Sequence, residues 1–168
     1  NLIDIQNEIK IKQPNNNKLP NIIAVSKTFE LANILPLIEF GHCDYGENKV
    51  QEAQDKWSNF KLDRPNLKLH MLGKLQTNKV KIAVKLFDYI HSLDNEKLAE
   101  KISKEQKKIN KKLKLFIQVN IGNEEQKSGI SVSNLKNFYE YCKKLDLNII
   151  GLMCLPPNNV NPAEYFIK

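Results

Sequence analysis

The fold of this chain is decided by the stretch NIIAVSK, residues 21–27. Four apolar residues in a row, followed by a polar pair, are typical of a buried strand in a parallel sheet whose tip carries function. A segment with apolar residues at helical spacing follows at residues 30–40, and Gly41 is well placed to end it. The stretch therefore predicts the first strand and helix of a βα unit.

The same alternation continues to the end of the sequence. Five more strands are expected, at residues 43–46, 67–73, 88–93, 114–120 and 148–155. Each is followed by a predicted helix, at residues 48–60, 77–86, 95–109 and 133–145 and from Pro162 onward. A short amphipathic helix is expected before the first strand, with a loop at residues 13–20. Strict alternation of strands and helices predicts a parallel sheet with helices outside it.

Chain length limits how much of a closed barrel these units could form. Six units share residues 21–168, about 25 residues each, whereas a (β/α)8 barrel has eight units and typically ~250 residues. We therefore expect an α/β fold: a TIM-type barrel truncated after about six βα units, with residues 1–168 as one domain that is incomplete at its C-terminus. The alternative is an open doubly wound sheet, which usually has a glycine-rich loop after its first strand. Residues 26–29 contain no glycine.

The charge is basic and comes almost entirely from lysine. The net charge is +7, and Arg64 is the only arginine, although arginine suits bidentate recognition of phosphates and bases best. A solvated, lysine-rich surface is therefore the favoured interpretation, and an RNA- or polyanion-binding module is kept as an alternative. No apolar run has membrane-spanning length. The three cysteines, Cys43, Cys142 and Cys154, lack zinc-ligand spacing, which predicts reduced thiols in a cytoplasmic protein.

Polar and small residues end each predicted strand. In a barrel, the carboxyl ends of the strands surround one site. The six tips are residues 26–28, 46–48, 73–76, 91–94, 118–120 and 151–153. We expect all six to line one shared pocket.

Lys27 is the sharpest candidate among these residues. A lysine at the end of a buried strand has a desolvated stem, and burial disfavours the ammonium, so a fraction of the amine is a neutral nucleophile. A neutral amine condenses with an aldehyde, and pyridoxal phosphate is the common biological example. The alternative is a structural lysine that extends from the strand end into water.

Other tips carry groups that suit a ring-shaped ligand. Asn48 can donate and accept hydrogen bonds at the edge of a pyridine ring, or it can cap the following helix. Met153 can lie against an aromatic ring, or pack in the core. Glu47 is expected to pair with a lysine in the mouth of the barrel.

The histidines and the remaining acids are weaker candidates. His70 is expected to be a hydrogen-bonded core residue, and no two histidines have the spacing of metal ligands. Asp88 and Asp94 suit loop and capping positions better than a paired acid and base. The sequence therefore predicts no metal site and no Ser-His-Asp arrangement.

Taken in order, the tips resemble the motifs of the pyridoxal phosphate homeostasis protein family, a single-barrel group related to the N-terminal domain of alanine racemase. Five of the matching stretches are residues 24–28, 45–52, 70–79, 91–94 and 151–153. The fifth motif in chain order consists of residues 118–121, Glu124 or Glu125, and residues 127–129. Six motifs in the right order, from about residue 21 to the end, make the resemblance specific.

The resemblance implies that pyridoxal 5′-phosphate is the cofactor and that Lys27 holds it as a Schiff base, with Asn48 and Met153 lining its ring. It implies a carrier in intracellular pyridoxal phosphate homeostasis, without robust catalytic turnover and with no catalytic residues assigned. We expect a monomer that delivers the cofactor to apo forms of pyridoxal phosphate-dependent enzymes and binds neither membrane nor nucleic acid. The alternative is a pyridoxal phosphate-dependent amino-acid racemase. A racemase would need a second base, and none of the tyrosines of this sequence can be assigned that role.

Two departures from the family pattern stand out. Leu69, Met71 and Lys74 replace residues that are common in the third motif. The family also places its phosphate-binding serine and an arginine–glycine–threonine group on two final strands, which this sequence lacks.

Overall fold

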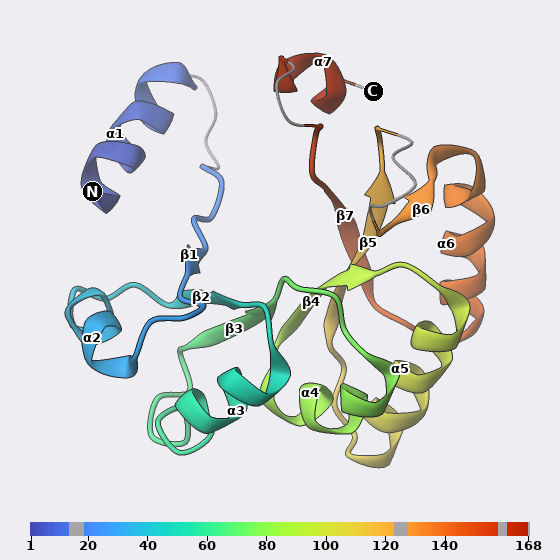
Figure 1. Cartoon of the computed structure of the whole chain (residues 1–168), viewed down its shortest axis with the longest axis horizontal. Helices are drawn as coiled ribbons and strands as arrows, with labels where there is room; N and C mark the ends of the chain where they lie inside the picture. Colours follow the sequence, from blue (N-terminus) through green and yellow to red (C-terminus); the bar gives the residue numbers. More distant parts are fainter. Residues whose placement is uncertain (14–18, 123–127, 158–160, 168) are drawn as a thin grey trace.

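A computed structural model describes residues 1–13, 19–122, 128–157 and 161–167, and it confirms the alternation of strands and helices (Figure 1). The strands are β1 (Ala24–Val25), β2 (Asp44–Glu47), β3 (Lys68–Met71), β4 (Tyr89–Leu93), β5 (Lys114–Asn120), β6 (Ile130–Ser131) and β7 (Ile149–Cys154). The α-helices are α1 (Leu2–Lys12), α2 (Leu31–Glu39), α3 (Val50–Trp57), α4 (Val80–Leu86), α5 (Glu96–Lys108), α6 (Leu135–Lys144) and α7 (Pro162–Phe166). Short 3₁₀ turns, η1 (Thr77–Lys79) and η2 (Val132–Asn134), precede α4 and α6.

The strands form one parallel sheet. Its order is β1-β2-β3-β4-β5, and both β6 and β7 pair with β5. The predicted α/β fold with a parallel sheet is therefore confirmed. Among the described residues, β1 pairs only with β2 and β7 only with β5, so the sheet does not close on itself.

The two faces of the sheet differ in chemistry. In β5, Leu115, Ile117 and Val119 are buried, whereas the alternating residues Phe116 and Gln118 are only half-buried. The buried set belongs to the core between the sheet and the helices that cover it (Figure 1). The opposite, inner face carries the polar side chains of Asp44, His70 and His91 together with the ring of Phe116.

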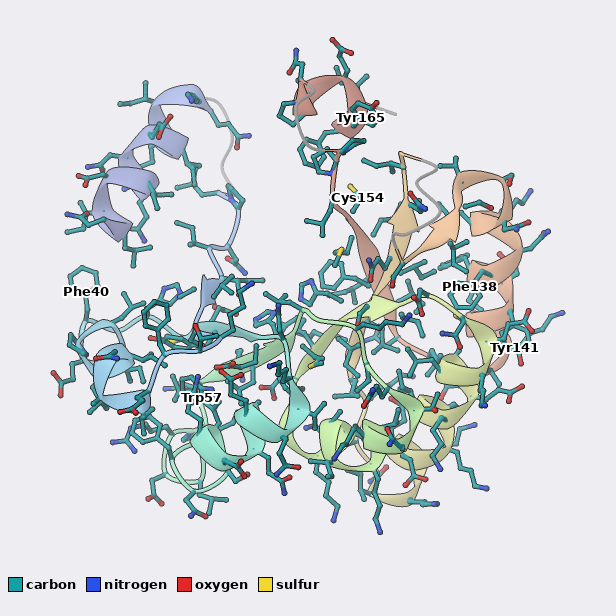
Figure 2. The ribbon with its side chains drawn as sticks, viewed as in Figure 1. Phe40, Trp57, Phe138, Tyr141, Cys154 and Tyr165 are labelled. Carbon is teal, nitrogen blue, oxygen red and sulfur yellow. The ribbon has the colours of Figure 1, made fainter. Side chains whose placement is uncertain are left out.

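The helices contribute large side chains to this core. Trp57 of α3 is fully buried, and its ring centroid lies 5.2 Å from that of Tyr45 in β2 (Figure 2). Phe138 and Cys142 are the buried residues of α6. These buried side chains pack the two helices on the sheet.

Several boundaries differ from those predicted. The first strand was expected over residues 21–27, but only Ala24–Val25 are in the ladder, after which the Ser26 N–H still donates to the Gly46 carbonyl at 2.9 Å. The sequence also missed β6, which pairs with the end of β5. Two residues are too few to display the alternation that identifies a strand.

The ends of the chain contribute little to the core. The predicted N-terminal helix is confirmed as α1, with a capping box between Asn1 and Asp4, but it has no buried residue. Of the predicted loop at residues 13–20, residues 14–18 lie outside the described residues. In the described part of the chain, no helix has both the length and the apolar character needed to cross a membrane.

Candidate functional site

A cavity of about 530 Å³ lies at the carboxyl ends of the strands. The residues around it come from the ends of β1, β2, β3, β5 and β7 and from the segment before β6: Val25, Lys27, Asn48, Leu72, Gly73, Lys74, Gln118, Val119, Asn120, Ser128, Met153, Cys154 and Leu155. Segments up to 130 positions apart in the chain thus share one hollow, because parallel strands end on the same side of a sheet.

The expectation that all six tips line this cavity is wrong for the fourth. Residues 91–94 do not border it. Ser92 and Leu93 are buried, and Leu93 is still in the ladder opposite Ile117. The end of β4 is therefore covered by packing.

Lys27 borders the cavity, but it is not buried as expected. The residue is exposed, so the prediction that β1 desolvates its stem is wrong. The cause is the short ladder of β1, which ends at Val25, itself 49% exposed. The Lys27 side chain makes no hydrogen bond or ion pair with any described residue, which leaves its amine available to a ligand.

Asn48 and Met153 border the same cavity and are both half-buried. The alternative role of Asn48 as a helix cap is wrong, because α3 begins at Val50 with Lys49 in the N-cap position. Asn48 sits against Gly73: a Cβ added to that glycine would lie 2.3 Å from the Asn48 carbonyl oxygen. A glycine is therefore required there for the ends of β2 and β3 to meet.

The described residues around the cavity give it a positive charge. Lys27 and Lys74 contribute two ammonium groups, and the described residues around the cavity include no carboxylate. The hydroxyl of Ser128 and the amides of Gln118 and Asn120 add neutral polar groups. This set of groups favours an anionic ligand of small-molecule size.

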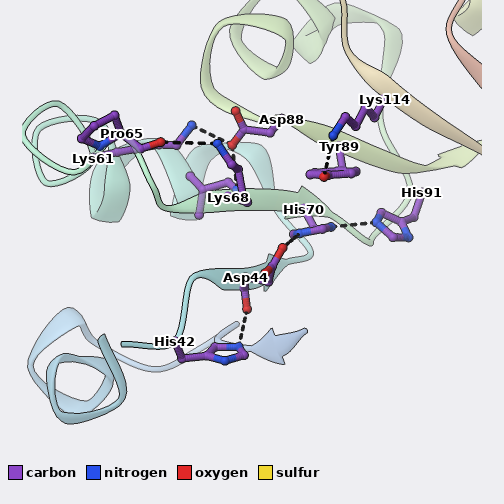
Figure 3. A network of polar contacts seen from close by, with 11 residues as sticks. His42, Asp44, Lys61, Pro65, Lys68, His70, Asp88, Tyr89, His91 and Lys114 are labelled. Atoms are coloured by element: carbon purple, nitrogen blue, oxygen red, sulfur yellow. Dashed lines mark hydrogen bonds and ion pairs between the residues drawn. The ribbon is translucent and has the colours of Figure 1, made fainter. Parts of the chain in front are cut away.

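A polar network occupies the inner face of the sheet nearer the amino ends of the strands (Figure 3). His70 Nε2 lies 2.9 Å from Asp44 Oδ1, and His70 Nδ1 lies 3.0 Å from His91 Nε2. Tyr89 stacks on His70 with centroids 4.2 Å apart, and Phe116 stacks on His91 at 4.3 Å. The prediction that His70 is a hydrogen-bonded core residue is therefore confirmed.

Burial shifts the titration of both histidines. It lowers the pKa of His91 to about 4, with a further contribution from neighbouring His70. It also lowers the pKa of His70, although the hydrogen bond and charge of Asp44 oppose that shift. Both rings are therefore neutral at pH 7.

The other acids have structural partners. Asp88 accepts from the Leu69 N–H at 2.8 Å and from Lys61 Nζ at 2.7 Å, which suits its predicted position in a loop. The N-cap of α5 is Asn95 and not Asp94. No group of three or more His, Cys, Asp or Glu side chains in the described ranges could hold a metal ion.

Glu47 pairs with a lysine, as expected, but not in the mouth of the barrel. Its Oε1 lies 2.9 Å from Lys56 Nζ on α3, and Glu47 does not border the cavity. Period-two alternation explains this placement, since Glu47 and Tyr45 point to the helices and Asn48 to the cavity.

The fold and cavity define a class: parallel α/β domains whose ligand site lies at the carboxyl ends of the strands. The family model for the N-terminal domain of alanine racemase matches residues 5–166. The pyridoxal phosphate homeostasis protein of Haemophilus influenzae is 36% identical over 167 residues, which cover 98% of this chain and 70% of that protein. The chain therefore belongs to the pyridoxal phosphate homeostasis protein family, within the wider group of alanine racemase N-terminal domains.

Solved structures agree with this assignment. The structure of PipY from Synechococcus elongatus without PLP has a TM-score of 0.79 and 34% identity, and it is matched over 92% of this chain and 73% of that chain. PipY with PLP bound has a TM-score of 0.76 and 33% identity, with the same coverage. The alanine racemase of Clostridium difficile is 16% identical, with a TM-score of 0.71, and the match covers 99% of this chain and 43% of that chain. At this identity, the match shows only that the two folds are similar. The chain spans 70% of the length of the Haemophilus influenzae protein and 58% of the length of the pyridoxal phosphate homeostasis protein of Pasteurella multocida.

Proposed function

We propose that this chain binds pyridoxal 5′-phosphate in the cavity at the strand ends, with Lys27 holding it as a Schiff base and Asn48 and Met153 lining its ring. One observation carries the proposal: these three residues, from the ends of three strands, border the same cavity. The relatives named for pyridoxal phosphate homeostasis, and the PipY structure with PLP bound, support the same ligand.

The chemistry of the cavity fits this cofactor. Pyridoxal phosphate supplies an aldehyde with which a primary amine condenses, and the Lys27 amine has no partner among the described residues. Its phosphate is an anion, which the ammonium group of Lys74 favours. The volume of about 530 Å³ is within the range of small-molecule sites.

The role we propose is that of a carrier in pyridoxal phosphate homeostasis which delivers the cofactor to apo enzymes. An amino-acid racemase would need a second base opposite the lysine, and the described residues around the cavity include no tyrosine or histidine. We further propose that the chain acts as a cytoplasmic monomer, with residues 1–168 in one barrel-type domain. The three free cysteines support that compartment.

An absorbance titration tests the proposed function. Adding pyridoxal phosphate to the purified chain should produce a visible band, and borohydride reduction followed by peptide mass spectrometry should locate the label on Lys27. Lys27→Ala should abolish the band, whereas Lys74→Ala should retain it with weaker affinity. Labelling of Lys74 with Lys27 unmodified would contradict the assignment, and steady racemisation of alanine or serine that Lys27→Ala abolishes would overturn the carrier role.

A further inference from the structure

The tip of β1 that carries Lys27 is weakly fixed by the sheet itself. β1 pairs with β2 only at Ala24 and Val25, and the Ser26 N–H makes the last backbone hydrogen bond to β2. Thr28 has φ +67°, a conformation that β-branched residues rarely adopt. Because the Lys27 side chain is long and exposed, the region its amine can reach depends on the backbone of residues 26–28.

Two side chains of α3 hold this backbone on both sides of Lys27. Lys56 Nζ donates to the Ser26 carbonyl oxygen at 2.8 Å. The Thr28 N–H donates to the carboxylate of Glu52. Lys56 and Glu52 are one helical turn apart, with Nζ and Oε1 separated by 3.7 Å, so one face of α3 contacts the residue before and the residue after Lys27.

A buried carboxylate fixes Lys56 in turn. Glu47 Oε1 accepts from Lys56 Nζ at 2.9 Å, Ser26 Oγ at 2.8 Å and Trp57 Nε1 at 2.9 Å. Glu47 is fully buried, the Lys56 side chain is 8% exposed, and Glu47 Oε2 makes no hydrogen bond with a described residue.

A contribution to folding stability does not explain well why the Glu47–Lys56 ion pair is buried. A buried ion pair contributes little net stability compared with apolar residues of the same volume, and an unsatisfied buried oxygen lowers that contribution further. Its definite structural effect is to fix the Ser26 carbonyl and hydroxyl beneath the tip of β1.

We infer that Glu47, Glu52 and Lys56 form a clamp that positions Lys27 for attachment of the cofactor. We call these three residues the β1 clamp. It also joins the tips of the neighbouring strands β1 and β2, because Glu47 directly precedes Asn48. The inference rests on the proposed function and deepens it by naming residues that act on Lys27 without touching the ligand.

The test separates covalent attachment from binding. Pyridoxal phosphate reacts with the Lys27 amine to form an imine and release one water, and visible absorbance follows the rate. Pyridoxine 5′-phosphate has an alcohol in place of the aldehyde, so its competition measures occupancy of the cavity alone. Glu52→Ala removes the acceptor of the Thr28 N–H, Glu52→Gln keeps an oxygen acceptor, and Asp55→Ala removes an exposed carboxylate of the same helix as a matched control.

Glu52→Ala should slow attachment about tenfold or more, while its affinity for pyridoxine phosphate changes less than about twofold, because misplacing a reactive group lowers rate more than binding. Glu52→Gln and Asp55→Ala should both react at the wild-type rate. The double variant Glu47→Gln, Lys56→Met removes the buried pair without leaving an unpaired charge, and it should show the same loss of rate. It provides the test if Glu52→Ala fails to fold.

The outcomes separate the clamp from the proposed function. Attachment at the wild-type rate in the folded clamp variants would overturn the clamp alone, as would an equal loss of pyridoxine phosphate binding, which would indicate a collapsed cavity. A wild-type chain that forms no adduct, or an adduct that survives Lys27→Ala, would overturn the proposed function and with it the clamp.

Discussion

Burial decides the protonation of the two histidines on the inner face of the sheet. The Asp44 carboxylate can only accept, so His70 Nε2 carries the proton that it shares with Asp44. In neutral His70, the Nδ1 then accepts from the Nε2–H of His91. The network is therefore a directed chain of donors that requires His70 to be neutral, and burial lowers the pKa of His91 and keeps that ring neutral as well.

The burial of His91 makes stability depend on pH. Because the pKa of His91 is lowered from 6.5 to about 4, the unfolded chain binds a proton more readily than the folded chain in that interval. The stabilisation is fully present above about pH 6.5 and is lost as the pH falls toward 4. We expect the free energy of unfolding, measured with urea, to fall by about 1–2 kcal/mol from pH 7 to pH 5 on account of this residue.

The variant His91→Gln isolates this contribution. Glutamine can still donate to His70 Nδ1 but does not titrate, so its stability should decline less between the two pH values. Equal pH slopes for the wild-type chain and His91→Gln would contradict the assignment.

At the scale of elements, α5 shows how local sequence and packing agree. Leu98, Ala99 and Ile102 are buried on one face of the helix, and the Asn95 side chain accepts from the Leu98 N–H at 2.9 Å. The cap satisfies one of the free N–H groups of the first turn, next to the side chain that enters the core.

Removing this cap should destabilise the chain without altering the cavity. Asn95→Ala should lower the free energy of unfolding by about 1 kcal/mol in urea titrations. Lys104→Ala, at an exposed position of the same helix, is the matched control and should change it by less than about 0.5 kcal/mol. A loss in Lys104→Ala as large as that in Asn95→Ala would show that the cap is not the cause.

At the scale of the whole molecule, the open sheet leaves apolar side chains uncovered at both of its ends. Val25 of β1 is 49% exposed, and Leu152 of β7 is 56% exposed, with Ile150 beside it at 45%. Uncovered apolar residues on an unpaired edge strand promote association between chains.

Leu152→Lys should therefore raise the solubility limit of the chain and lower its light scattering at high concentration. The melting temperature should change by less than about 2 °C, because an exposed side chain contributes little to the core. A large fall in melting temperature would mean that Leu152 is covered in the folded chain.

Local sequence was sufficient to determine the order of the elements. Helical spacing of apolar residues predicted α2 to α6 to within a few residues, and the runs at residues 114–120 and 148–155 gave β5 and β7 with small shifts. Such patterns can be recognised in the sequence because they involve residues close together in the chain. The residues that share one face are three or four positions apart in a helix and two positions apart in a strand. The two residues of β6 are too few for this signal, and β1 was predicted from its apolar run but is shorter than expected.

The arrangement of the site depended on contacts between distant residues. Sequence selected Lys27, Asn48 and Met153, but only the tertiary structure placed them around one cavity, left Lys27 exposed and excluded the fourth tip. The pairing of β1 with β2 and of β2 with β3 joins residues 21 and 24 positions apart, and side-chain burial depends on which helices cover each face. For the same reason, the partner of Glu47 could be expected to be a lysine but could not be identified as Lys56 of the helix layer.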